Sequence, residues 1–304
     1  MRSTRLGHRA QRALLPYTFI LPAVIALVLF SIYPFVSGIW YSFTSIGWVG
    51  DAATFVGLKN YQTLLTGDVG AAKFFKDAFY RSIIWTLLVV AGQFVVGLGV
   101  ALVLNEKFPG RTLFRTLTML PIALPTVLIA LTWQWMYDPY YGIINHYLVE
   151  WGLLSAPKIW VGQTTSPIWP LIVVGIWRGF PFMALMLLSG LQGLPEELYD
   201  AAKVDGAGVV ARFANITLPQ MRTIIGIALM LHVLWWWNHF DILLIVGTSG
   251  AEFGIGSSTL PILGWVEAFR WSHLARGAAI SVMAMVGVAG VMVWNARRAL
   301  RTVA

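Results

Sequence analysis

The feature that most constrains this chain is a series of apolar runs of roughly 20 residues, separated by short polar stretches. An α-helix rises about 1.5 Å per residue, so a run of this length crosses the roughly 30 Å hydrocarbon core of a bilayer. Charged residues make up 11% of the chain, less than half of the roughly 25% usual in soluble domains. The sequence therefore predicts an all-α polytopic membrane protein with six transmembrane helices, over residues 17–43, 79–104, 116–137, 167–191, 222–246 and 276–296.

The distribution of basic residues predicts the orientation of these spans. With six spans, both termini lie on one side of the membrane, and that side carries thirteen Lys and Arg residues against seven on the other. Basic residues are enriched in cytoplasmic segments, so both termini are expected in the cytoplasm. The predicted organisation is a cytoplasmic segment over 1–16, a transmembrane domain over 17–296 and a cytoplasmic tail over 297–304.

The chain lacks the sequence motifs on which several kinds of nucleotide binding and catalysis depend. The chain has no G-x-x-x-x-G-K-[ST] phosphate loop, no H-E-x-x-H zinc helix and no G-x-S-x-G nucleophile elbow. It has no cysteine, which excludes disulfides, thiolate metal sites and a cysteine nucleophile. The formal charge of +8 lies in short clusters between apolar runs, as topology requires, and does not indicate nucleic acid. We expect no catalytic residue, no metal and no cofactor bound by this chain.

A polar interruption, ELYDAAKVDGAGVVARFANITLP, lies between the fourth and fifth runs and on the predicted cytoplasmic side. Pro195, Glu196 and Glu197 favour the start of a short helix, and Gly206 favours its end. A second short helix is expected to end at Pro219, before the fifth span. Connections between bundled helices usually have about two to eight residues, so one of about thirty favours a docking surface over a mere connector.

The same residues resemble a known family. Asp200-Ala201-Ala202, then Gly206, then Ile216-x-Leu218-Pro219 match the E-A-A…G…I-x-L-P loop of binding-protein-dependent ATP-binding-cassette importer permeases, with Asp where the family usually has Glu. Residues 55–61, 120–145 and 176–208 are similar to the carbohydrate-uptake branch and its MalF-like subunits. The resemblance implies a MetI-like fold whose coupling helix, within 193–221, sits in a cleft of a cytoplasmic ATPase. The residues that it implies for this loop are Glu197, Asp200, Ala201, Ala202, Asp205, Gly206, Ile216, Leu218 and Pro219.

Span five contains LHVLWWWNHFDI, which places His232, Trp235, Trp236 and His239 at i, i+3, i+4 and i+7, on one helical face. Ionisable groups at membrane depth usually face the bundle interior or a water-filled path. Indole rings pack on sugar rings, and imidazole exchanges hydrogen bonds with hydroxyls. Periodicity alone leaves a substrate pathway and plain helix packing equally open. A metal site at the two histidines is disfavoured because no third ligand is evident.

The resemblance favours the pathway. It implies that His232, Trp236 and His239 line a sugar site with Trp235 beside them, and that span four adds Gly175, Gly179 and Phe182 around Trp177. Gly175 and Gly179 also form a small-xxx-small pair, which allows close helix packing. For Arg178, in the middle of span four, a structural pair with Asp241 is favoured over a contact with a polar ligand.

These inferences combine into one expected function, the permease subunit of an ATP-driven carbohydrate importer in a bacterial-type inner membrane. The implied partners are a second homologous permease subunit, two ATPase subunits that bind ATP and magnesium, an extracytoplasmic sugar-binding protein and membrane lipid. An importer permease for another solute, a proton- or sodium-coupled secondary transporter, and a membrane-embedded enzyme remain as alternatives. The expected internal repeat of a secondary transporter is not evident.

Overall fold

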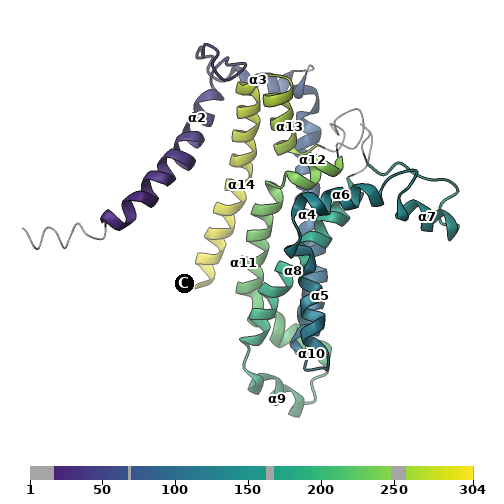
Figure 1. Cartoon of the computed structure of the whole chain (residues 1–304). Coiled ribbons are helices and arrows are strands. Elements are labelled where there is room, and N and C mark those ends of the chain that lie inside the picture. Colours follow the sequence, from purple (N-terminus) through teal and green to yellow (C-terminus); the bar gives the residue numbers. More distant parts are fainter. Residues whose placement is uncertain (1–16, 68–69, 162–167, 248–257, 304) are drawn as a thin grey trace, which may run out of the picture. The chain divides into compact units, whose positions relative to one another are not determined.

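The computed structural model describes residues 17–67, 70–161, 168–247 and 258–303, so the predicted cytoplasmic segment 1–16 lies outside the described residues. These residues are helical, apart from loops and one isolated bridge between Thr44 and Phe55. The chain divides into two compact units, residues 1–67 with 264–283, and residues 68–263 with 284–304. The elements of each unit are labelled in Figure 1.

The second unit is built on three long helices, α4 (Ala71–Asn105), α8 (Trp169–Gln192) and α11 (Leu218–Trp237). They run side by side in Figure 1, and all three pack against one another. One core cluster between them is apolar, with Leu104, Met183, Leu187 and Met221 fully enclosed. Helix α5 (Arg111–Ala123) packs on α8, and α12 (Asp241–Gly247) packs on α6 (Thr126–Met136) and α8.

Glycines let the α4 and α8 backbones approach closely. A Cβ atom at Gly97 would lie 2.9 Å from Met183 Cγ and 3.1 Å from the backbone nitrogen of Ala184. A Cβ at Gly92 would overlap the side chain of Ile176. Lipid tails are as apolar as the side chains between helices, so burying apolar surface does not by itself drive helices together in a membrane. Small residues at such contacts favour association because they allow close packing.

The predicted continuous span 116–137 is wrong. Helices α5 and α6 form a pair bent by 92°. The break falls at Leu124, which is extended with ψ 140°, and at Pro125, which caps α6. A residue that precedes proline is disfavoured in the helical region, and proline supplies no N–H to continue the helix, so the chain turns there.

The fifth span also differs from the predicted 222–246. Residues Val209–Trp237 form one continuous helix, so Pro219 does not separate a short helix from the span. A π-helical turn over Phe213–Thr217 precedes the proline, and Leu218 N–H bonds to Phe213 O across it. This wider turn lets the helix continue past Pro219, which has no N–H to donate. The span ends at Trp237, and α12 begins separately at Asp241.

By length and hydropathy, four helices within the described ranges can cross a membrane, or five if the bent pair counts as one span. The first is Tyr17–Tyr41, which contains a π turn η1 (Val28–Ile32) and helix α2 (Tyr33–Tyr41). In the last helix, α14 (Leu274–Val303), the described apolar stretch is Leu274–Gly290, which is shorter than the four spans. The sixth span therefore stays a prediction. The other helices are α3 (Lys59–Thr66), α7 (Ile143–Glu150), α9 (Glu196–Val204), α10 (Val209–Arg212), α13 (Leu260–Trp265) and the π turn η4 (Val266–Arg270).

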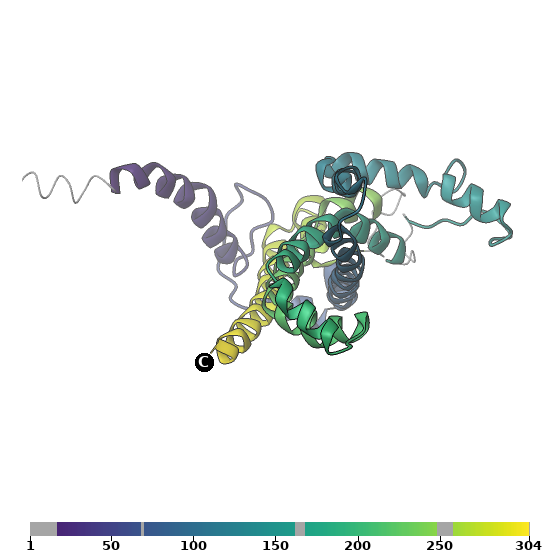
Figure 2. The same ribbon diagram turned by 90° about the horizontal axis from the view of Figure 1, so that it is seen from below.

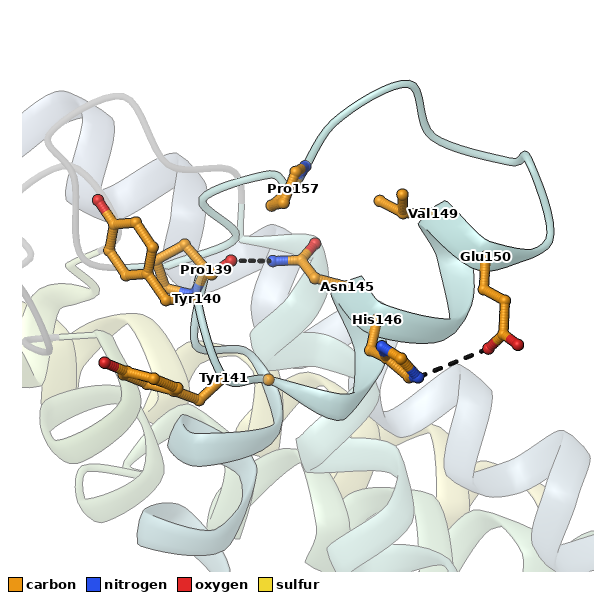
Figure 3. A pocket seen from close by; sticks show the side chains of 9 residues that line it. Pro139, Tyr140, Tyr141, Asn145, His146, Val149, Glu150 and Pro157 are labelled. Carbon is orange, nitrogen blue, oxygen red and sulfur yellow. Dashed lines mark hydrogen bonds and ion pairs between the residues drawn. The ribbon is translucent and has the colours of Figure 1, made fainter.

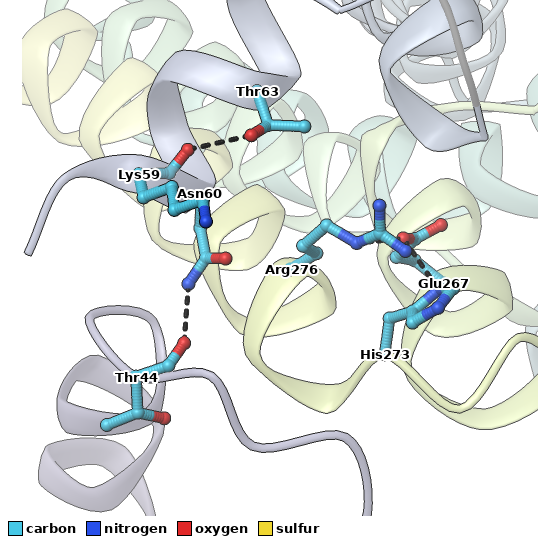
Figure 4. Close-up of polar contacts among 7 residues, drawn as sticks. All are labelled: Thr44, Lys59, Asn60, Thr63, Glu267, His273 and Arg276. Carbon is cyan, nitrogen blue, oxygen red and sulfur yellow. Dashed lines mark hydrogen bonds and ion pairs between the residues drawn. The ribbon is translucent and has the colours of Figure 1, made fainter. Parts of the chain in front are cut away.

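Polar contacts organise the first unit, as Figure 4 shows. The Asn60 amide donates to the backbone oxygens of Ser42 (2.9 Å) and Thr44 (2.8 Å), which ties α3 to the end of α2. The fully buried Glu267 carboxylate pairs with Arg276 at 2.7 Å and with His273 at 3.1 Å. A buried carboxylate is stable only when it is paired, so this cluster holds the turn between η4 and α14 in place.

The glycine contact between α4 and α8 leads to the first test. Gly97→Val should lower the melting temperature of the full chain in detergent, because its side chain meets the Ala184 backbone, which cannot move aside easily. Overpacking of this kind costs about 1–3 kcal/mol. The matched control is Gly99→Val on the same helix, where a Cβ has nothing within 4 Å. Equal melting temperatures for the two variants would contradict the close-packing assignment.

Candidate functional site

The loop that follows α8 is a helix and a glycine turn. Helix α9 begins after Pro195, with Glu196 and Glu197 in its first turn, as predicted. It ends in a Schellman motif, in which Gly206 N–H bonds to Lys203 O (3.1 Å) and Ala207 N–H bonds to Ala202 O (2.8 Å). Gly206 has φ +77°, in the left-handed region, where a side chain is strained. The predicted helix stop at Gly206 is thus confirmed, with its physical reason.

This loop carries apolar side chains that are exposed on the protein surface. Val204, Val209 and Val210 are 89%, 73% and 81% exposed and flank the Gly206 turn. A Cβ at Gly206 has nothing within 4 Å, so the turn faces open space. Figures 1 and 2 show α9 at one end of the bundle formed by α4, α8 and α11. Exposed valines on a polar loop are typical of a docking surface.

The nine residues expected in the loop lie on two elements. Glu197, Asp200, Ala201, Ala202, Asp205 and Gly206 belong to α9 and its turn, whereas Ile216, Leu218 and Pro219 lie in the continuous helix Val209–Trp237. A hydrogen bond of 2.9 Å between the hydroxyls of Tyr199 and Thr217 connects the two parts. Asp200, one of the loop residues that the resemblance implies, forms an exposed 2.8 Å ion pair with Lys203.

The predicted pathway residues gather where α11 crosses α4 and α8. Trp236 is 4% exposed, stacks on His239 with ring centroids 4.4 Å apart, and lies 5.7 Å from Trp85. Trp85 Nε1 donates to Trp236 O (2.9 Å), at the end of the helix. A Cβ at Gly175 would lie 3.2 Å from Trp236, and one at Gly179 would lie 2.8 Å from it. Both glycines thus make room for the indole, which confirms the small-xxx-small interpretation.

The other predicted residues separate into two groups. Phe182 lies 5.0 Å from Trp235 and 5.7 Å from His232, ring centroid to centroid. Trp235 is 57% exposed, unlike the neighbouring Trp236. Trp177 packs elsewhere, edge-on against Trp133 at 5.9 Å.

His239 does not share the helical face predicted for it. The helix ends at Trp237, and His239 lies in the turn before α12. Asn238 caps the helix, and its side chain donates to Leu234 O (3.0 Å), which competes with continuation of the helix. His239 still reaches the cluster because the turn folds its ring onto Trp236.

The residue that sequence reasoning missed is Gln93, which is fully buried in α4. Its Nε2 donates to Gly175 O at 2.8 Å, and its Oε1 lies 2.6 Å from His232 Nδ1. One carboxamide therefore bridges α4 to both α8 and α11. The available signal was a lone amide within a long apolar run, a position that requires an internal partner.

Two expectations about charges and metals can be compared with the geometry. Arg178 and Asp241, the favoured pair, make no ion pair, and Arg178 Nε is buried without a hydrogen-bond partner. The physical reason is that Asp241 is an exposed residue at the start of α12, beyond the end of α11. No cluster of three or more His, Cys, Asp or Glu that could hold a metal occurs in the described parts of the chain.

A separate cavity of about 400 Å³ lies beside α7 (Figure 3). Tyr140 and Tyr141 flank it, and an ion pair of 3.5 Å between His146 and Glu150 closes one side. Asn145 is buried below it and fixes the segment, since its amide donates to Lys158 O (2.9 Å) and accepts from Trp160 Nε1 (2.9 Å). The sequence analysis did not predict this hollow.

Comparisons with known proteins agree with this architecture. Residues 93–299 match the family described as "Binding-protein-dependent transport system inner membrane component". The trehalose/maltose transport system permease protein MalF of Thermococcus litoralis is 33% identical over 287 residues, 93% of this chain and 92% of that protein. The sulfoquinovosyl glycerol transport system permease protein SmoG of Agrobacterium fabrum is 32% identical over 271 residues, 89% of this chain and 85% of that protein. The fold matches a chain of a bacterial ABC transporter involved in the import of the acidic polysaccharide alginate, with a TM-score of 0.83, 19% identity and coverage of 98% and 99%.

The family model and the two permease relatives define the class of this chain, an inner-membrane transport permease. The chain belongs to the family of binding-protein-dependent transport system inner membrane components. It is a multi-pass, non-catalytic subunit of an ABC importer of the inner membrane, and it works with a binding protein and an ATPase. The family resemblance is confirmed, and the secondary transporter and the membrane-embedded enzyme are no longer alternatives.

The two neighbouring tryptophans of α11 provide the second test. Trp236→Ala should strongly lower the melting temperature of the full chain in detergent, because it opens a cavity against Trp85 and both glycines; such truncations cost about 3–5 kcal/mol. Trp235→Ala, the matched control, should have little effect on stability because that ring is largely exposed. The assignment of Trp236 to the packed core is wrong if both variants melt alike.

Proposed function

We propose that this chain forms half of the translocation pathway of a carbohydrate importer and works by alternating access. Two relatives support the solute class, since one is a trehalose/maltose permease and the other a sulfoquinovosyl glycerol permease, both at 32% identity or more. The aromatic and imidazole groups of α8 and α11 add physical support, because they match the apolar faces and hydroxyls of sugars. An importer for another solute remains the alternative.

The proposed pathway residues are those of the cluster at α8 and α11. Phe182 and the exposed Trp235 supply stacking surfaces, and His232 and His239 supply hydrogen-bonding nitrogens. The Nε2 atoms of both histidines are buried without a hydrogen-bond partner in the described structure. A buried polar atom without a partner costs about 1–3 kcal/mol, which a polyhydroxylated solute would offset. We propose that Trp236, Gly175 and Gly179 support these groups, whereas Trp177 packs against Trp133 outside the cluster.

The loop 193–221 is proposed as the coupling loop. The observation that carries this proposal is the exposed trio Val204, Val209 and Val210 around the open turn at Gly206. We propose that an ATPase subunit covers this surface, and that closure of two such subunits on ATP and magnesium moves the spans. A second homologous permease subunit, forming a heterodimer, and an extracytoplasmic sugar-binding protein complete the proposed assembly.

The proposed topology has six spans within 17–296 and both termini in the cytoplasm, flanked by 1–16 and 297–304. It requires α9 to face the cytoplasm and α3 to face the outside. A single cysteine at Gly208 should resist an impermeant thiol reagent added to intact cells, whereas one at Thr66 should react with it. Both positions are exposed, so accessibility does not distinguish them. Labelling of Gly208→Cys from outside would reverse the proposed orientation.

The function itself is tested by uptake into vesicles that contain this chain with its partner subunits. ATP-dependent uptake of trehalose, maltose or sulfoquinovosyl glycerol is expected, and Gly206→Trp should abolish it together with ATPase association, because indole occupies the docking turn. The control is Gly110→Trp, another open glycine with positive φ (+84°), which carries the same backbone strain outside the loop. Retained ATPase binding in Gly206→Trp would sink the coupling assignment, and uptake of none of the three solutes would sink the solute class.

A further inference from the structure

The hydrogen bonds of Gln93 determine which nitrogen of His232 carries the proton. Gly175 O is a carbonyl oxygen and only accepts, so the Gln93 NH₂ group must face it across the 2.8 Å contact. The Gln93 oxygen is then the atom 2.6 Å from His232 Nδ1. An oxygen at that distance accepts, so Nδ1 bears the hydrogen. A hydrogen on Nε2 as well would have no acceptor in the described structure, so the imidazole is neutral and Nε2 can only accept.

The surroundings leave Gln93 no other arrangement. Gln93 is 0% exposed and His232 is 1% exposed, so water does not compete for either group. The approach of the amide to Gly175 O passes over Gly179, where a Cβ would overlap Gln93 Nε2. Glycine at 179 therefore opens the path by which an α4 side chain reaches the α8 backbone.

The other ring nitrogen of His232, Nε2, lacks a partner in the described part of the chain. Nε2 is buried and makes no hydrogen bond within the described residues. Phe182 and Trp235 flank the ring, at 5.7 Å and 6.3 Å between centroids. An acceptor-only nitrogen between two aromatic rings suits a hydroxyl that donates.

We propose that Gln93 is a positioning residue, which fixes His232 in the Nδ1–H tautomer so that Nε2 accepts a hydrogen bond from a solute hydroxyl when the proposed alternating-access motion exposes this nitrogen. Gln93 itself does not touch the solute. The effect on transport rests on the proposed function, whereas the tautomer does not depend on which solute is carried.

Nitrogen-15 NMR of the full chain in nanodiscs, labelled at histidine, tests the tautomer directly. The chain has five histidines, and the difference spectrum against His232→Gln identifies the signal of interest. Wild-type His232 should show a protonated Nδ1 and a bare Nε2. Gln93→Met, similar in shape but without the amide, should lose this preference, and Gly179→Ala should do the same by displacing the amide. Gln134→Met, which changes a glutamine of α6 without a side-chain hydrogen bond, should leave the spectrum unchanged.

Uptake kinetics with maltose and trehalose test the consequence. Gln93→Met should raise KM roughly tenfold with Vmax unchanged, as expected for one lost hydrogen bond to the solute. In a His232→Ala background it should raise KM no further, because Gln93 acts through His232. Additive effects on KM in the double variant would overturn the proposal and make Gln93 a packing residue only. In the NMR experiment, an unprotonated Nδ1 in the wild type or an unchanged spectrum in Gln93→Met would also overturn it. Failure of the wild type to take up either sugar would count against the solute class alone, since the spectrum still decides the tautomer.

Discussion

The structure depends on the constraint that a hydrocarbon environment offers no hydrogen-bond partner, so each backbone and polar side-chain group must find one inside the protein. Long uninterrupted helices satisfy the backbone, and the chain leaves them only where it supplies a substitute. At the end of α11, Asn238 donates to Leu234 O and Trp85 donates to Trp236 O. Before Pro219, a π turn redirects the N–H of Leu218 to Phe213 O. Both of these irregularities are therefore paired with a specific donor.

The same constraint explains why the packing of the three helices and the candidate site depend on the same residues. Close approach of α4 and α8 requires glycines at 92, 97, 175 and 179. Two of these, Gly175 and Gly179, also receive Trp236, and the bare backbone at 179 lets Gln93 bond to Gly175 O. A methyl group at 179 would thus disturb helix packing, the indole and the imidazole of His232 together. We infer that the glycines serve the site by admitting its side chains and not by contacting a solute.

The sequence predicted features that depend on local chemistry and missed those that depend on which helices meet. Pro195, the two following glutamates and Gly206 each act within a few residues, so the start and end of α9 followed from them. His239 was misplaced because a helical period was extended through Asn238, whose capping bond is made by its side chain. Gln93 was missed because α4 beyond its charged first turns is apolar on all sides, and its pattern does not indicate which face meets α8 and α11. The dipeptide Leu124–Pro125 indicates the bend at Pro125, but the length of the apolar run led to the prediction of one continuous span.

The continuous helix Val209–Trp237 gives the proposed coupling loop a mechanical connection to the proposed pathway. Its first turns carry the exposed Val209 and Val210, and the Tyr199–Thr217 hydrogen bond ties α9 to its base. His232 lies 23 residues beyond Val209, or about 35 Å along a helix. A helix without a sharp break moves as a body, so a displacement of the docking surface reaches His232 and Trp236 without passing through a flexible joint. A separate helix ending at Pro219, as the sequence predicted, would have introduced such a joint. Because Val209–Trp237 is one continuous helix, a single element connects the proposed coupling loop with the proposed pathway.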